Sequence, residues 1–148
     1  MHFLVATDGS TESEEALEHA IDLAAAADAR LTVVNAVQPR IRSGGLEPTR
    51  SLSDAERRLI VENVEEAEAR GEAILERAAE TVSDAGVDVD TELLYGSPVE
   101  AIVEYADPGA HDLLVVGHRG LSGRAESLLG STASELIRRA PVPVTVVR

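Results

Sequence analysis

Short apolar runs alternate with segments of helical periodicity along the whole chain, and this alternation limits the fold more than any other sequence feature. Parallel strands need such a helical crossover between them, so the pattern predicts an α/β domain. We expect an open, Rossmann-like sheet of five strands with helices on both faces. The 148 residues contain no repeat or linker, which predicts a single domain over 1–148. The expected strands are 2–7, 31–37, 87–94, 113–116 and 142–147. The expected helices are 11–29, 53–85, a short one that opens at Ser97 and Pro98, and 132–139. A long loop is expected over 38–52.

Local signals refine the starts of two of these helices. Thr11 with Glu14, and Ser53 with Glu56, have the spacing of a capping box, in which the two side chains satisfy free N–H groups. Gly71 lies inside the second helix, where glycine disfavours helical backbone, so the sequence allows a bend or a break there.

The charge of the chain limits its partners. The formal net charge is −14, and all 13 basic residues are Arg. Such a surface repels phosphate backbones and anionic lipids, so we expect neither nucleic acid nor membranes as partners. We expect adaptation to a salt-rich cytosol, as in a halophilic archaeon, with a chance bias in a small acidic protein as the alternative. The absence of cysteine, of a secretory signal and of a membrane-spanning apolar run predicts a cytoplasmic location.

Basic residues concentrate at the C-terminal end. Residues 118–148 hold five Arg against two Glu, a net of +3, whereas residues 1–117 hold eight Arg against 25 carboxylates, a net of −17. An anionic ligand would therefore be attracted to the C-terminal segment.

A glycine-rich segment with the chemistry of a phosphate cradle lies in that basic stretch, directly after the apolar run 113–116. Glycine leaves no Cβ between the backbone and a ligand, a helix start offers free N–H groups and hydroxyls, and arginine adds fixed positive charge. In a purely structural alternative, the glycines turn the chain and Thr132 with Glu135 forms an ordinary capping box. The residues in question are Gly117, Arg119, Gly120, Arg124, Gly130, Ser131 and Thr132.

The spacing of these glycines resembles the ATP-binding members of the universal stress protein family, which carry Gly, two residues, Gly, nine residues, Gly, then Ser or Thr. Residues 117–131 match that pattern without a gap, and 5–10 and 140–147 resemble the family's first and last strands. The resemblance implies a strand order of 3-2-1-4-5, with a nucleotide across the carboxyl ends of strands 1 and 4. It also implies a homodimer through the edge strand 142–147.

The resemblance and the loop chemistry together predict the residues that line the nucleotide. Asp8 is expected near the ribose or a phosphate-bound Mg²⁺; alternatively, its carboxylate satisfies N–H groups of the first helix. The family often carries His-Val at the end of strand 2, where this chain has Asn35 and Ala36. Backbone groups make that contact, so we expect binding to survive. The full set is Ala6, Thr7, Asp8, Ala36, Val116, Gly117, Arg119, Gly120, Gly130, Ser131 and Thr132.

These observations predict a module that holds and senses ATP (or ADP or AMP) with little or no turnover. The loop offers no evident base or nucleophile, and the chain has no lysine to bridge phosphates as a P-loop does. Two alternatives stay open. One is slow ATP hydrolysis, with Asp8 holding Mg²⁺ and Arg119 or Arg124 stabilising charge. The other is a nucleotide-free dimeric scaffold. His2, His19 and His111 do not have the spacing of metal ligands.

Overall fold

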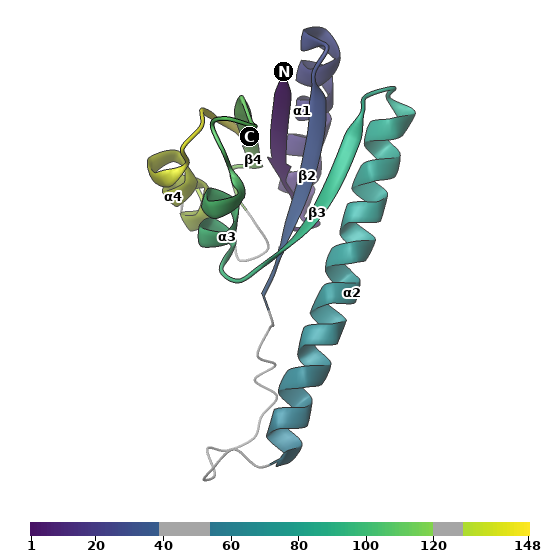
Figure 1. The fold of residues 1–148 in the computed structure, drawn as a ribbon, viewed down its shortest axis with the longest axis vertical. Helices are drawn as coiled ribbons and strands as arrows, with labels where there is room; N and C mark the ends of the chain where they lie inside the picture. Colours follow the sequence, from purple (N-terminus) through teal and green to yellow (C-terminus); the bar gives the residue numbers. More distant parts are fainter. Residues whose placement is uncertain (39–53, 120–128) are drawn as a thin grey trace.

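The computed structural model describes residues 1–38, 54–119 and 129–148, and only the helical backbone of 54–63. The described strands form one sheet in the order β3-β2-β1-β4-β5, and every neighbouring pair is parallel, which confirms the predicted topology (Figure 1). The elements are β1 (His2–Ala6), α1 (Thr11–Ala27), β2 (Arg30–Val37), α2 (Asp54–Asp84), β3 (Val89–Tyr95), α3 (Pro98–Tyr105), β4 (Leu113–Gly117), α4 (Ser131–Arg139) and β5 (Val144–Val147).

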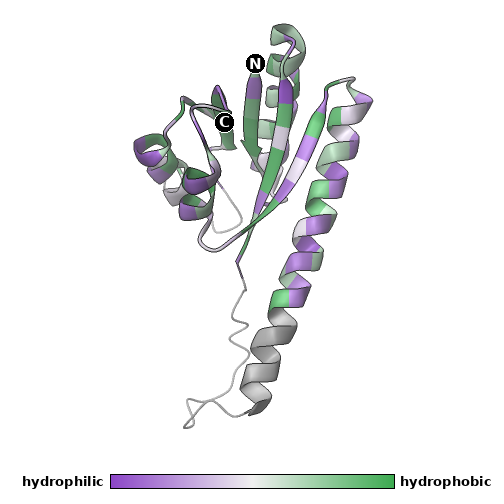
Figure 2. Cartoon of the chain, in the orientation of Figure 1, coloured by the Kyte–Doolittle hydropathy of each residue, from purple (hydrophilic) through white to green (hydrophobic). Residues whose placement is uncertain are grey.

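Each face of the sheet carries its own hydrophobic core. Phe3 and Val5 of β1 face α1 and α2, whereas Leu4 between them faces α3 and α4. Because β1 and β4 lie between two helical layers, they are apolar on both faces, as central strands of a parallel sheet must be. The colouring of Figure 2 shows this, with hydrophobic strands inside and hydrophilic outer helix faces.

Two predicted capping boxes are wrong. Helix α1 begins at Thr11, but its cap is Ser10, whose Oγ accepts a hydrogen bond from the N–H of Ser13 at 3.2 Å. Helix α4 begins at Ser131 behind Gly130, so Thr132 lies inside the helix instead of capping it. The third box, on Ser53, falls outside the described residues, as does most of the loop 38–52. The short helix does open at Pro98 behind Ser97.

The last strand is shorter than predicted because of its prolines. Strand β5 begins at Val144, whereas Val142 is buried before it. Proline has no N–H to donate to a neighbouring strand, so pairing begins only after Pro143. The carbonyl of Pro143 still accepts a hydrogen bond from the N–H of Leu114 at 2.8 Å. The third strand is also displaced, beginning at Val89 instead of residue 87.

Helix α2 is continuous through Gly71, without the break that the sequence allows. The glycine serves packing instead. A Cβ on Gly71 would lie 2.7 Å from both the Asn35 Oδ1 and the Leu93 Cδ1 atoms. Such contacts are shorter than van der Waals distance, so the absence of a side chain lets α2 lie directly on β2 and β3.

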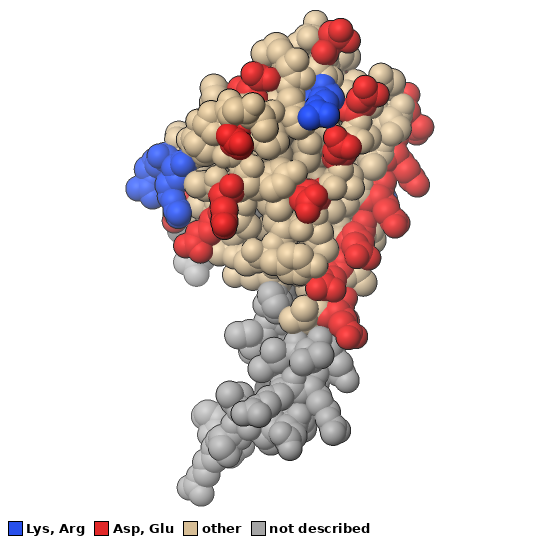
Figure 3. Space-filling view, viewed as in Figure 1, with Lys and Arg blue, Asp and Glu red and all other residues tan. Residues whose placement is uncertain are grey.

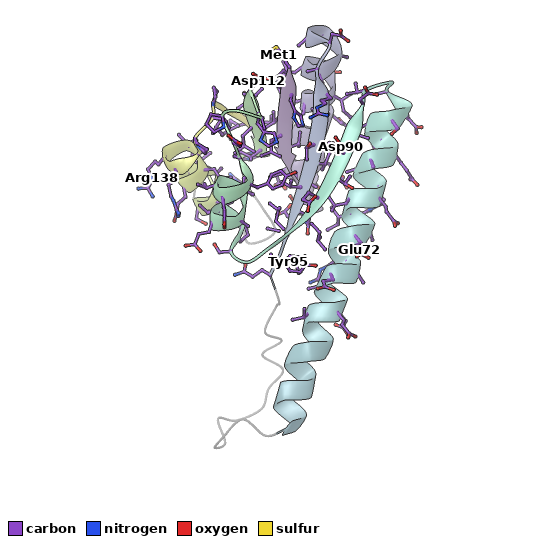
Figure 4. The ribbon with its side chains drawn as sticks, in the orientation of Figure 1. Met1, Glu72, Asp90, Tyr95, Asp112 and Arg138 are labelled. Atoms are coloured by element: carbon purple, nitrogen blue, oxygen red, sulfur yellow. The ribbon has the colours of Figure 1, made fainter. Side chains whose placement is uncertain are left out.

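Two histidines that are far apart in sequence meet at the amino end of the sheet. The rings of His2 and His111 lie 4.7 Å apart, centroid to centroid. His2 Nδ1 lies 3.0 Å from the Ala110 carbonyl oxygen and 3.3 Å from Arg30 Nη2, and its Nε2 shares a hydrogen bond with the hydroxyl of buried Thr32 at 2.7 Å. Asp112, labelled in Figure 4, accepts a hydrogen bond from the backbone N–H of His2. This arrangement suits a neutral His2 ring.

We expect His2 to make the stability of the protein depend on pH. Burial, then Arg30 and His111, lower the pKa of His2 below 6.5, and the hydrogen bond to the Ala110 carbonyl and then Asp90 only partly oppose them. As the pH falls below 6.5, the unfolded chain takes up this proton before the folded chain does, so the free energy of unfolding falls. Urea titrations between about pH 7.5 and 5.5 measure the slope. The slope should be shallower in His2→Gln; equal slopes would contradict this assignment.

Candidate functional site

The carboxyl ends of β1 and β4 lie side by side at the centre of the sheet. Strand β1 pairs with β2 on one side and with β4 on the other, so the chain order reverses between β1 and β4. Open α/β sheets bind ligands in the crevice at such a reversal. The fold therefore brings the two ends that the sequence singled out, 6–8 and 116–119, to one place.

Three of the predicted residues lie on the same face of the sheet at this place. Ala6, Ala36 and Val116 all belong to the α3/α4 side. Ala6 is in register with Val34 on β2, and Ala36 lies two residues further along that strand. Ala6 and Ala36 are partly exposed at the strand ends, whereas Val116 is buried.

Thr7 follows directly on β1 and is bound to the protein through each of its polar groups. Its N–H donates to the Val34 carbonyl at 3.0 Å, and its carbonyl accepts from the Asn35 side-chain amide at 2.8 Å. Its hydroxyl lies 3.0 Å from the hydroxyl of Ser13 in the first turn of α1. Thr7 is therefore placed to hold the turn after β1, and its side chain points into α1.

Asp8 is half-buried in the same turn. Its Oδ1 accepts a hydrogen bond from the N–H of Ser10 at 3.0 Å, so the carboxylate does satisfy an N–H group at the start of the first helix. Gly9 follows with φ at +79°, in the left-handed region that favours glycine. The Ser10 side chain then caps α1. The chain itself thus satisfies the N-terminus of α1.

Gly117 at the end of β4 has a structural role that the sequence does not reveal. A Cβ at this position would lie 2.6 Å from the backbone carbonyl oxygen of Glu12. The first turn of α1 therefore rests directly on the end of β4. Gly117 is needed for this approach whether or not a ligand is present.

Backbone hydrogen bonds connect the residues before the glycine-rich loop to those after it. The N–H of Gly130 donates to the His118 carbonyl at 2.7 Å, and the N–H of His118 donates to the Val147 carbonyl at 2.8 Å. A Cβ on Gly130 would lie 3.1 Å from the His118 carbonyl oxygen and 3.3 Å from the Arg119 Cα. Gly130 thus places the start of α4 against Arg119. Gly120 and Arg124 lie outside the described residues.

The start of α4 has the properties of an anion site. No described side chain caps it, and its first turn carries no acidic residue, whereas Ser131 and Thr132 expose hydroxyls there. The backbone of Arg119 lies beside this start, and the Nε of Arg119 is buried without a hydrogen-bond partner among the described residues. A buried unpaired donor is costly, and a helix N-terminus attracts negative charge. These residues fit a phosphate group.

The other helix starts at this edge are less suited to an anion. Helix α1 is capped by Ser10 and carries Glu12 and Glu14 in its first turn. Helix α3 begins with Pro98, which lacks an N–H, and carries Glu100 in its first turn. Carboxylates in a first turn repel an incoming phosphate, so of these three described helix starts the one of α4 suits a phosphate best.

No group of three histidine or carboxylate side chains that could hold a metal ion occurs within the described parts of the chain. A Mg²⁺ near Asp8 would need the phosphate oxygens of a nucleotide as its other ligands. The role of Asp8 in metal binding stays a prediction.

The sequence reasoning missed the part that Asn35 plays in this site. We treated Asn35 only as a departure from the family pattern, yet its buried amide holds the Thr7 carbonyl. The signal was present in the sequence. Asn35 and Thr32 are the two polar residues inside the otherwise apolar run 31–37, and a polar side chain there requires a hydrogen-bond partner once it is buried.

Comparisons with known proteins agree with this geometry. The model of the universal stress protein family matches residues 1–148. A universal stress protein of Methanocaldococcus jannaschii is 34% identical over 98% of this chain and 80% of its own length. The structure of universal stress protein UspA from Lactobacillus plantarum has a TM-score of 0.84 at 25% identity, covering 100% of this chain and 97% of its own. A crystal structure of a universal stress protein in complex with cAMP has a TM-score of 0.70 at 32% identity, with the same coverage.

Proposed function

The chain belongs to the universal stress protein family, and we propose that it binds an adenine nucleotide, ATP (or ADP or AMP), at the carboxyl ends of β1 and β4. The observation that carries the proposal is the start of α4: no described side chain caps it, and it lies beside the backbone of Arg119, whose buried Nε has no partner among the described residues. The phosphates would meet the N–H groups and hydroxyls of Ser131 and Thr132.

The apolar surface on the same edge suits the adenosine. Ala6, Ala36 and Val116 would lie against the base and sugar, with Asp8 near the ribose or a Mg²⁺ carried by the phosphates. The structure solved with cAMP, at 32% identity, supports an adenine nucleotide as the class of ligand. The base and the phosphates would therefore occupy neighbouring parts of one site.

The proposed role is sensing or regulation, with little or no turnover. A bound Mg²⁺ would neutralise charge on the phosphates. Hydrolysis also requires a group that positions or deprotonates water. Asp8, the carboxylate expected closest to the ligand, has Oδ1 occupied by the Ser10 N–H, which weakens it as a base. Binding without rapid hydrolysis is the chemistry that these residues support best.

This function is tested by identifying what the protein carries. The protein is purified gently, denatured, and its released small molecules are analysed by mass spectrometry. We expect an adenine nucleotide in an amount comparable to that of the protein. Absence of any nucleotide, together with an unchanged thermal transition on adding ATP, would favour the nucleotide-free scaffold instead.

We further propose a homodimer formed through 142–147, centred on Val144–Val147. Strand β5 is an edge of the described sheet, and all four of its residues are partly exposed. Ile137 on the neighbouring helix α4 is 50% exposed. An apolar edge strand invites pairing with a second copy. Sedimentation at low and at high salt should give the mass of a dimer; a monomer in both would refute it.

The acidic surface supports the proposal of a salt-rich cytoplasm. Acidic side chains line the outer face of α2 (Figure 3), including Glu65, Glu66, Glu72, Glu76, Glu80 and Asp84. Salt screens the repulsion between them. We expect the free energy of unfolding to be higher in molar KCl than in dilute buffer, and equal values would overturn this proposal.

Within the described residues, no helix is long and apolar enough to cross a membrane.

A further inference from the structure

Asn35 occupies a position where a polar side chain is costly. It lies in β2 between Val34 and Ala36, and only 7% of it is exposed. A buried amide without partners destabilises a fold, so its hydrogen bond has to offset that cost. The bond that the structure shows runs from Asn35 Nδ2 to the Thr7 carbonyl, at 2.8 Å. Because a carbonyl only accepts, this contact fixes which end of the amide faces Thr7.

The opposite side of the Asn35 side chain is enclosed by helix α2. A Cβ on Gly71 would lie 2.7 Å from Asn35 Oδ1, so only a glycine leaves the amide its place. Helix α2 and β2 make extensive contact around this point. The amide is therefore confined between Gly71 and the end of β1, with little freedom to rotate.

The held carbonyl belongs to the turn that carries Asp8. The Thr7 hydroxyl meets Ser13 Oγ at 3.0 Å, and the Ser13 hydroxyl donates to the Ser10 carbonyl at 2.9 Å. Ser10 in turn donates its N–H to Asp8 Oδ1. Thr7, Ser10 and Ser13 are all buried, so a chain of hydrogen bonds, buried except for the partly buried last one, links Asn35 to the Asp8 carboxylate.

We propose that Asn35 is a positioning residue of the nucleotide site that fixes the turn carrying Asp8. The absence of a side chain at Gly71 of α2 leaves the space that the Asn35 amide occupies. The proposal rests on the proposed function, because it assigns Asn35 an effect on nucleotide affinity. Asn35 acts through Thr7 and needs no contact with the ligand. Helix α2, which supplies none of the predicted nucleotide contacts, then influences affinity through the space that it leaves at Gly71.

The test is the variant Asn35→Asp, which keeps the shape of the side chain but replaces the donor with an oxygen. At pH 7.5 the introduced carboxylate repels the Thr7 carbonyl, and we expect ATP to bind about tenfold more weakly than to the wild type. At about pH 5.5 the introduced carboxyl, which is buried and faces the Thr7 carbonyl, takes up a proton and donates again. The affinity relative to wild type at that pH should therefore recover, and because stability recovers with it, the control variant below separates the two effects.

A second variant approaches the same amide from the other side. Gly71→Ala improves helix propensity, so α2 should still form, but its methyl group presses on Asn35 Oδ1. We expect a weaker loss of ATP affinity, about threefold. The matched control is Val82→Ala, also on α2 and fully buried, which lowers stability away from the turn and should leave the affinity unchanged.

Amide hydrogen exchange separates this inference from the proposed function, because it needs no ligand. In the nucleotide-free protein, the Ser10 N–H that bonds to Asp8 should exchange faster in Asn35→Asp than in Val82→Ala. Unchanged ATP affinity in both Asn35→Asp and Gly71→Ala, while the wild type binds ATP, would overturn the inference alone. A wild type that binds no nucleotide would overturn the proposed function, and equal Ser10 exchange would show independently that Asn35 does not hold the turn.

Discussion

Gly117→Ala is expected to lower the free energy of unfolding by about 2 kcal/mol, within the range typical of overpacked sites. The added methyl group would lie 2.6 Å from the Glu12 carbonyl oxygen and 2.8 Å from its carbonyl carbon. Backbone atoms cannot rotate away as a side chain does, so the first turn of α1 must move off β4. That movement also displaces the turn that carries Asp8, and nucleotide affinity should fall with stability.

The control for this prediction is Gly109→Ala. A Cβ on Gly109 would meet only the side chain of Asp107, at 3.3 Å or more, so the change should be nearly neutral. Urea unfolding followed by circular dichroism measures both variants. If Gly117→Ala proves as stable as Gly109→Ala, α1 does not rest on the end of β4 as closely as described.

Arg119→Ala is expected to weaken ATP binding by about tenfold to a hundredfold, because hydrogen bonds to charged groups contribute about 1.5–3 kcal/mol. Its Nε is buried without a partner among the described residues, and phosphate oxygens would satisfy it. Adenosine, which has no phosphate, should bind both proteins alike. Arg119→Lys should lie between the two, since lysine keeps the charge but lacks the planar fork of donors.

Arg138→Ala is the control for the charge itself. It removes the same charge from the last turn of α4, where the side chain is exposed and points outward (Figure 4). Calorimetric titrations with ATP and with adenosine compare the variants. Equal losses of ATP affinity in Arg119→Ala and Arg138→Ala would mean that only net charge matters, which would contradict the placement of the phosphates beside Arg119.

The order of the elements could be predicted from the sequence because it depends on local patterns. Apolar runs and helical periodicity located every strand and helix to within a few residues. The strand order came from the resemblance to the family, since local patterns do not say which strands pair. The cap of α1 was misplaced because Ser10 and Thr11 are adjacent hydroxyl residues. Which of the two caps the helix depends on where the turn after β1 ends and α1 begins, and the local sequence does not specify that point.

The sequence indicated which glycines matter, but it did not predict the structural role of each one. Gly117 was expected to leave space for a ligand, which stays a prediction, and the sequence allowed a bend or a break at Gly71. Each permits a close approach to a residue far away in sequence, Glu12 in one case and Asn35 in the other. Spacing along the chain cannot show such contacts, because they depend on how helices lie on the sheet. The glycine pattern of this loop therefore reports on packing as well as on phosphate binding.

The central claim, that the chain binds an adenine nucleotide beside α4, is tested most directly by calorimetric titration. The purified protein is freed of small molecules, confirmed to be folded by circular dichroism, and titrated with ATP in the presence of Mg²⁺. We expect saturable heat with one nucleotide bound per chain, and weaker binding to Arg119→Ala. A folded wild-type protein that gives no saturable heat with ATP, ADP or AMP would contradict it.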